Sequence, residues 1–80
     1  MKIPSHVNAA WIATLGNDQL VTAEGKLYKD FHKREVAEKS RSGARYKLLH
    51  GPSELVNAWH HWSLVSNEAR ARGVIVRRAR

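Results

Sequence analysis

The sequence predicts a small, mainly α-helical single domain of three helices, with short extended segments near residues 46–49 and 74–78. Three observations predict this class. The chain has 80 residues, which suits one domain and is too short for two. Apolar residues recur at spacings of three and four along most of the chain. Pro, Gly and Ser lie where these periodic runs begin or end.

The central prediction is a helix within residues 51–73. Pro52 presets φ for a first helical turn, and the Ser53 side chain can accept a hydrogen bond from a backbone N–H of that turn. At the other end, Gly73 suits the left-handed conformation in which many helices end. The apolar face of this helix consists of Leu55, Ala58, Trp59, Trp62, Val65 and Ala69.

Two shorter apolar patterns precede it. We expect a first helix over residues 5–15, with Ser5 as its N-cap and Gly16 at its end; a β-strand through residues 10–15 is the alternative. We expect a second helix from near Gln19, capped by Asn17 or Asp18. Its apolar face holds Leu20, Ala23 or Glu24, Leu27 and Phe31, and residues 32–42 extend it as a polar, solvated arm.

The core predicted from these faces is rich in tryptophan. Large aromatic side chains give a short chain the apolar area that it needs. Trp59 and Trp62 are therefore predicted as core, and stacking on nucleobases is the alternative, which needs an indole exposed beside arginines. The predicted core comprises Trp11, Leu20, Leu27, Phe31, Leu55, Trp59, Trp62 and Val65.

Residues 44–50 read as a linker or a single strand, and the β-branched run at 74–76 reads as a strand or extended tail. A lone strand needs a pairing partner. Residues 1–3, residues 46–49 and another subunit are all open candidates, so homo-oligomer formation is a further expectation.

Charge is the most informative bulk property. Fourteen Lys and Arg against seven Asp and Glu give a net charge of +7, which favours a polyanionic partner over a mere solubility role. The basic residues gather in a connector at 39–47 and a tail at 74–80, which we expect to be mobile. The residues predicted to contact phosphates are Lys39, Arg41, Arg45, Lys47, Arg70, Arg72, Arg77 and Arg78.

Several functional classes lack support in the sequence. There is no cysteine for a disulfide or a thiolate zinc site, and no apolar run reaches the roughly 18–20 residues of a membrane helix. No signal peptide is apparent, so a cytoplasmic protein is expected. His60 and His61 are adjacent on a helix and point about 100° apart, which is poor geometry for one metal. We expect no metal and no cofactor.

One carboxylate stands at the edge of an apolar face. We expect Glu24 to be partly buried and to pair with Lys26, Tyr28 or an arginine. A single carboxylate without a second acid or a nucleophile–base pair is weak evidence for catalysis.

A pattern of Pro52, Leu55, Val65, Glu68, Ala69, Arg70, Arg72 and Gly73 resembles the C-terminal helix of small pyrimidine-dimer DNA glycosylases of the endonuclease V type. Residues 18–21 with Glu24 loosely resemble the family's first long helix, which carries its catalytic glutamate. The family attacks with an N-terminal amine exposed by methionine removal. Here Lys2 follows Met1, and Lys26 lies closer than Glu24 to the register of that glutamate. The resemblance therefore implies an α-helical DNA-binding scaffold without the chemistry.

Together these observations predict a small, basic, non-enzymatic nucleic-acid-binding protein of bacterial or phage type. The alternative is a phage-type accessory or inhibitor protein that binds an acidic host protein, and a glycosylase-like DNA repair enzyme is the third possibility. Polyanion binding gains support if the 39–47 and 70–80 clusters share one face, whereas clusters on opposite sides of the molecule favour a solubility role.

Overall fold

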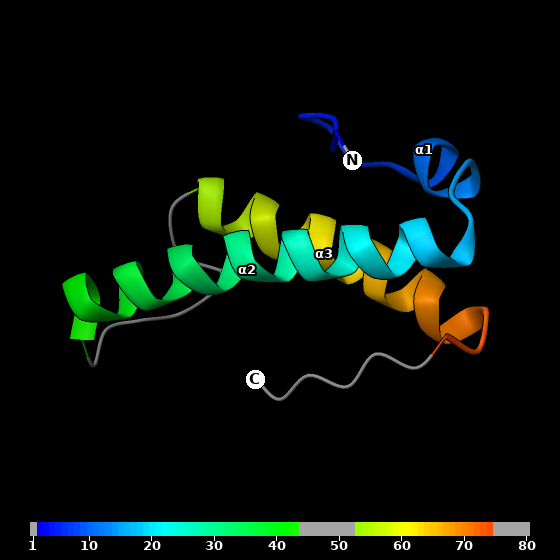
Figure 1. The fold of residues 1–80 in the computed structure, drawn as a ribbon. Helices are drawn as coiled ribbons and strands as arrows, with labels where there is room; N and C mark the ends of the chain where they lie inside the picture. Colours follow the sequence, from blue (N-terminus) through cyan, green and yellow to red (C-terminus); the bar gives the residue numbers. More distant parts are fainter. Residues whose placement is uncertain (1, 44–52, 75–80) are drawn as a thin grey trace.

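The computed structural model describes residues 2–43 and 53–74, which form three helices (Figure 1). These are α1 (Ala9–Ala13), α2 (Asn17–Ser42) and α3 (Ser53–Ala71). The long helices α2 and α3 run in opposite directions and pack on each other, and α1 lies where α2 begins and α3 ends. The predicted mainly α, three-helix domain is confirmed. The extended segments predicted near 46–49 and 74–78 lie outside the described residues, except for Val74.

Helix α1 is shorter than the sequence suggested. It begins at Ala9 because Asn8 caps it: Asn8 is extended, with φ −142°, and its Oδ1 accepts a hydrogen bond of 2.9 Å from the Trp11 backbone N–H. The prediction of Ser5 as the N-cap was therefore wrong, and the alternative of a strand through 10–15 was also wrong. Asparagine caps as well as serine does, so the two signals competed within four residues.

Helix α2 begins one residue after Gly16, which is its N-cap. The Gln19 side-chain oxygen accepts a hydrogen bond of 2.9 Å from the Gly16 backbone N–H and thereby satisfies a donor at the helix start. Asn17 and Asp18, the predicted caps, lie inside the first turn instead. The helix continues to Ser42, so the polar arm at 32–42 is helical as predicted.

Helix α3 ends as the sequence predicts. Gly73 adopts φ 75°, and its N–H donates to the Arg70 carbonyl at 3.0 Å, while the Val74 N–H donates to the Ala69 carbonyl at 2.9 Å. These two bonds form a Schellman motif. Val74 also packs against the core, so the motif has the hydrophobic contact that commonly accompanies it.

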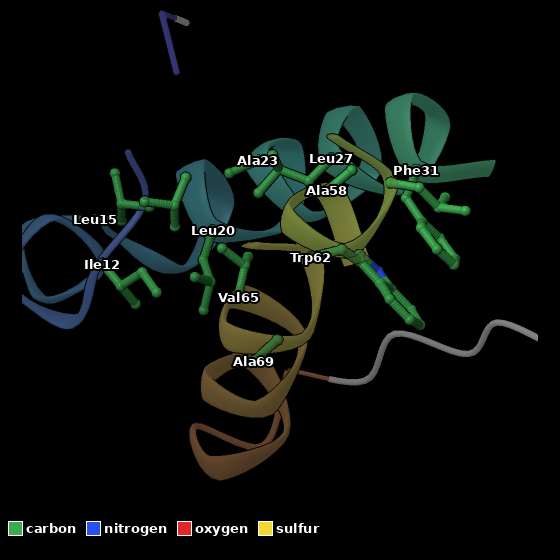
Figure 2. Packing of buried hydrophobic residues seen from close by; sticks show 12 residues of the cluster. Ile12, Leu15, Leu20, Ala23, Leu27, Phe31, Ala58, Trp62, Val65 and Ala69 are labelled. Carbon is green, nitrogen blue, oxygen red and sulfur yellow. The ribbon is translucent and has the colours of Figure 1, made fainter. Parts of the chain in front are cut away.

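The core lies between α2 and α3 and is closed at one end by α1 (Figure 2). Six of the eight predicted core residues are buried, and Trp11 and Trp59 are half-buried at its edge. Val7, which the apolar spacing places on the inner face of the predicted first helix, is 2% exposed although it precedes α1. The buried cluster comprises Val7, Ile12, Leu15, Leu20, Ala23, Leu27, Phe31, Leu55, Ala58, Trp62, Val65 and Ala69.

Trp62 contacts both aromatic and charged residues in this core. Its ring stacks on Phe31 with centroids 5.7 Å apart and an interplanar angle of 2°, and Tyr28 meets it edge-on at 5.5 Å. Its indole N–H donates a hydrogen bond of 2.8 Å to Glu24 Oε2. Glu24 is 0% exposed, so the carboxylate that we expected to be partly buried is fully buried, and Trp62 is a partner that the sequence did not indicate.

Replacing Trp62 by Phe tests the importance of this hydrogen bond. The variant keeps an aromatic ring but leaves Glu24 Oε2 without its indole donor, and an unsatisfied buried polar group costs about 1–3 kcal/mol. We expect the free energy of unfolding, measured by urea denaturation with far-UV circular dichroism, to fall by about that amount. Trp59→Phe is the matched control, because the Trp59 indole has no hydrogen bond within the described residues. Equal stability of the two variants would contradict the role assigned to the Glu24–Trp62 bond.

Candidate nucleic-acid interface

The members of the predicted phosphate-contacting set that the structure describes lie at the C-terminal ends of α2 and α3, which are at opposite ends of the α2–α3 hairpin (Figure 1). Lys39 and Arg41 lie in the last turn of α2, and Arg70 lies in the last turn of α3 with Arg72 just beyond it. The 19 residues of α3 span about 28 Å, which sets the scale of the separation. The described residues therefore do not form one continuous basic patch. Four predicted residues lie outside the described part of the chain: Arg45, Lys47, Arg77 and Arg78.

The acidic residues are balanced within the helices. All seven lie in α2 and α3. Asp18 and Glu54 lie in first turns, where the helix dipole favours negative charge, and Glu24 is buried. The other four form ion pairs with a base three or four residues later: Asp30–Arg34 at 3.2 Å, Glu35–Lys39 at 3.9 Å, Glu38–Arg41 at 2.8 Å and Glu68–Arg72 at 2.8 Å.

Most of the excess positive charge therefore lies in the sequence segments that come after α2 and after α3. Residues 44–52 come after the end of α2 and residues 75–80 come after the end of α3, and neither segment contains an acidic residue. Between them they hold Arg45, Lys47, Arg77, Arg78 and Arg80.

Arg72 is part of the scaffold. Its Nε donates to Glu68 at 2.8 Å, and its two terminal nitrogens donate to the Leu15 carbonyl at 2.6 Å and the Ile12 carbonyl at 3.2 Å. Carbonyls at the end of a helix lack intrahelical donors, so this guanidinium caps α1 and fastens it to α3. The Arg72 side chain is 22% exposed. The sequence shows the Glu68 spacing but gives no sign of a contact 57 or 60 residues away.

Arg70 differs from Arg72 in every one of these respects. It is exposed, and it has no ion-pair partner within the described residues. Its side chain lines a hollow of about 320 Å³ on one flank of α3. We call this hollow the α3 groove; its lining residues are Trp59, Trp62, Ser63, Ser66, Asn67 and Arg70.

Trp59 brings an aromatic side chain into the α3 groove. The residue is half-buried against the core, and within the described residues its indole takes part in no hydrogen bond and no ring stacking. Trp62, three residues later, has both kinds of contact. Base stacking requires an exposed indole beside an arginine. Trp59 is partly exposed and lies in the same hollow as Arg70.

A second hollow, of about 410 Å³, lies between residues 3–5, α2 and α3. Its lining mixes charges: Lys26 and His61 are present together with Asp30 and Arg34, and both oxygens of Asp30 accept from Arg34 Nε at 3.2 Å. Among residues 2–43 and 53–74, no group of three His, Asp or Glu side chains is placed to hold a metal ion.

The titration of His61, which lines this hollow, is perturbed. Partial burial lowers the pKa of His61 below its ordinary value of 6.5, and the neighbouring His6 and His60 lower it further, while Asp30 acts in the opposite direction. The rings of His6 and His61 meet edge-on at 6.1 Å. This arrangement favours a neutral His61 imidazole near neutral pH.

No family model, no curated protein and no solved structure matches this chain. The resemblance to pyrimidine-dimer glycosylases thus stays a prediction. Glu24, which loosely matches the family's glutamate, is enclosed in the core, whereas Lys26, nearer in register, lines the second hollow. Within the described ranges, no helix has both the length and the apolar character needed to cross a bilayer.

Arg72→Ala tests the scaffold role of this arginine. The substitution removes the donors to the Ile12 and Leu15 carbonyls, and hydrogen bonds made by charged groups contribute about 1.5–3 kcal/mol. We expect the melting temperature to fall by roughly 6–20 °C for a domain of this size. Arg70→Ala, two residues earlier, removes the same charge and should change the melting temperature little. Similar losses in the two variants would show that charge alone matters, and not the contacts of Arg72.

The lowered pKa of His61 predicts a pH dependence of stability. Because the folded state binds a proton on His61 more weakly than the unfolded state does, the unfolded state takes up more protons as the pH falls. The contribution of His61 is therefore fully present above about pH 6.5 and decreases as the pH falls below that value. We expect His61→Gln to lose less stability than the unsubstituted protein between pH 7.5 and 5, by urea denaturation. His32→Gln, which removes an exposed histidine that is not among the groups acting on His61, should keep the original pH dependence; the same flattening in both variants would refute the assignment.

Proposed function

We propose that this protein is a small, non-enzymatic nucleic-acid-binding protein that contacts phosphates through basic residues at both ends of the helical hairpin. The distribution of charge carries the proposal. The helices pair, bury or place at helix N-termini all of their acidic residues, and two acid-free basic segments follow α2 and α3 in the sequence. Positive charge that no acid offsets attracts polyanions and makes their binding depend on salt.

The described residues suggest which bases contribute most. Arg70 at the end of α3 has no acidic partner in the described part of the chain, and the same holds for Lys29 and Lys33 on the exposed side of α2. Lys39 and Arg41 are paired with acids on α2, so their charge is partly offset. Arg72 is withdrawn from the predicted set because its donors hold α1.

A ligand that contacts the bases at both ends must lie along the hairpin. The two ends are about 28 Å apart, by the length of α3. A single small anion cannot reach both ends, whereas a nucleic acid strand carries phosphates over the whole distance. Lys29 and Lys33, one helical turn apart on the exposed side of α2, are further candidate phosphate contacts.

An electrophoretic mobility shift at increasing salt tests the proposal. We expect binding to duplex DNA at low ionic strength, with the logarithm of the association constant falling linearly with the logarithm of salt concentration. Each phosphate contact contributes about 0.9 to that slope. Replacing Arg77 and Arg78 by Ala should lower the slope by up to about 1.8, and the Lys replacements, which keep the charge, should preserve it.

The outcomes separate this function from the alternatives. Absence of binding at low salt, or binding that salt does not weaken, would exclude it. A stoichiometric protein recovered by pull-down after nuclease treatment would favour the docking of an acidic protein on the same basic residues.

A further inference from the structure

We propose that the α3 groove is a stacking site for a base of single-stranded nucleic acid, with Trp59 as the stacking platform and Arg70 as a phosphate contact. The inference rests on the proposed function, and it adds the strand type and the residues that read it. Stacking on an indole requires an aromatic side chain that the fold does not already use on all sides. The three tryptophans of this chain differ in that respect.

Trp62 is unsuited to ligand binding. Its indole N–H donates a hydrogen bond to Glu24, its ring stacks on Phe31, and Tyr28 packs against it in an edge-type contact. The residue is only 6% exposed. Trp59, within the described residues, has no hydrogen bond on its indole nitrogen and no aromatic partner, and it lines the groove. Base–aromatic stacking tolerates any base, because every base has a π face.

The remaining lining residues suit a nucleotide better than an apolar ligand. Arg70 supplies a positive charge with no acidic partner in the described part of the chain, and Ser63 and Asn67 supply hydroxyl and amide groups. Trp59, Ser63 and Arg70 follow each other at intervals of four and seven residues, so they lie on one flank of α3. An amide side chain can form hydrogen bonds with base edges, and a guanidinium can bind phosphate in a bidentate manner.

Stacking on an indole favours an unpaired strand. A hollow of about 320 Å³ lies at the lower end of the volume range of small-molecule sites and is large enough to take one base. A base in a duplex is stacked on both faces, so an indole can reach it only after it leaves the stack. Eleven residues separate Trp59 from Arg70, about 16 Å along the helix axis. Arg70 would therefore hold a phosphate farther along the strand from the stacked nucleotide.

Fluorescence titration with a short oligothymidylate tests the inference directly. Stacking on Trp59 should quench the tryptophan emission, and an abasic strand of equal length and charge should bind roughly 5- to 150-fold more weakly. The Trp59→Phe variant should lose the quenching, while Trp11→Phe, which removes a tryptophan outside the groove, should retain it.

The affinity variants separate the base contact from the phosphate contact. Trp59→Leu, which keeps an apolar side chain against the core, should weaken the binding of oligothymidylate and leave the abasic strand unaffected. Arg70→Ala should weaken both strands, and more than Lys2→Ala, which removes an equal charge at an exposed position outside the proposed binding residues. Circular dichroism verifies the fold of each variant, and Asn67→Ala, at an exposed position, provides a second groove variant that does not disturb the core.

Three results would overturn the inference. They are equal affinity for the base-bearing and abasic strands, full affinity for oligothymidylate in the Trp59→Leu variant, and quenching that persists in Trp59→Phe. If these occur while salt-dependent binding to duplex and single strands remains, the proposed function stands and the stacking site fails. If no polyanion binds at low salt, both fail together.

Discussion

The hydrogen bond from the Trp62 indole to the buried Glu24 carboxylate is the constraint on which the packing of α2 against α3 depends. Burying a carboxylate is costly unless a donor meets it, and Trp62 is the donor that α3 brings to Glu24. The hydrogen bond from Trp62 to Glu24 fixes the rotation of α3 about its axis, because the indole must at the same time stack on Phe31 and contact Tyr28 edge-on. An apolar pair at these positions would tolerate several helix rotations, whereas one donor and one acceptor tolerate few. A buried polar pair of this kind specifies one packing arrangement of the core.

A second constraint acts at the other end of the hairpin. The guanidinium of Arg72 binds carbonyls of Ile12 and Leu15 and thus attaches α1, which at five residues is far too short to be stable alone. Trp62 and Arg72 therefore stabilise the fold. Trp59 and Arg70 lie close to them in sequence, but within the described residues the Trp59 indole and the Arg70 guanidinium make no hydrogen bond, ion pair or ring contact. In both pairs the residue type alone does not reveal which member serves the fold.

This division explains which predictions succeeded. The helices α2 and α3 followed from local signals, namely apolar spacing and the Gly73 cap, because such signals act over a few residues. The start of α1 was wrong because Asn8 and Ser5 are both good caps and only their tertiary surroundings decide between them. Arg72 was grouped with phosphate-contacting residues because its contacts with Leu15 and Ile12 span 57 and 60 positions. Helical spacing predicts that the residues lining the α3 groove lie on one flank of α3. It does not predict that Trp59 is partly exposed, because that depends on how Trp62 packs in the core.

Because some basic residues stabilise the fold, net charge alone is limited evidence for function. Helix C-termini attract cations through the helix dipole, so bases in the last turns of α2 and α3 have a structural reason to be there. Lys39 and Arg41 lie in such a last turn and also form ion pairs with acids on their own helix, so their presence is weak evidence for a nucleic-acid partner. Arg70 also lies in a last turn, but it has no acid beside it in the described residues and it shares a hollow with an indole. A base that only stabilised the helix end would not need that neighbour. The combination of Arg70 with Trp59, more than the charge of +7, is what directs the functional inference toward nucleic acid.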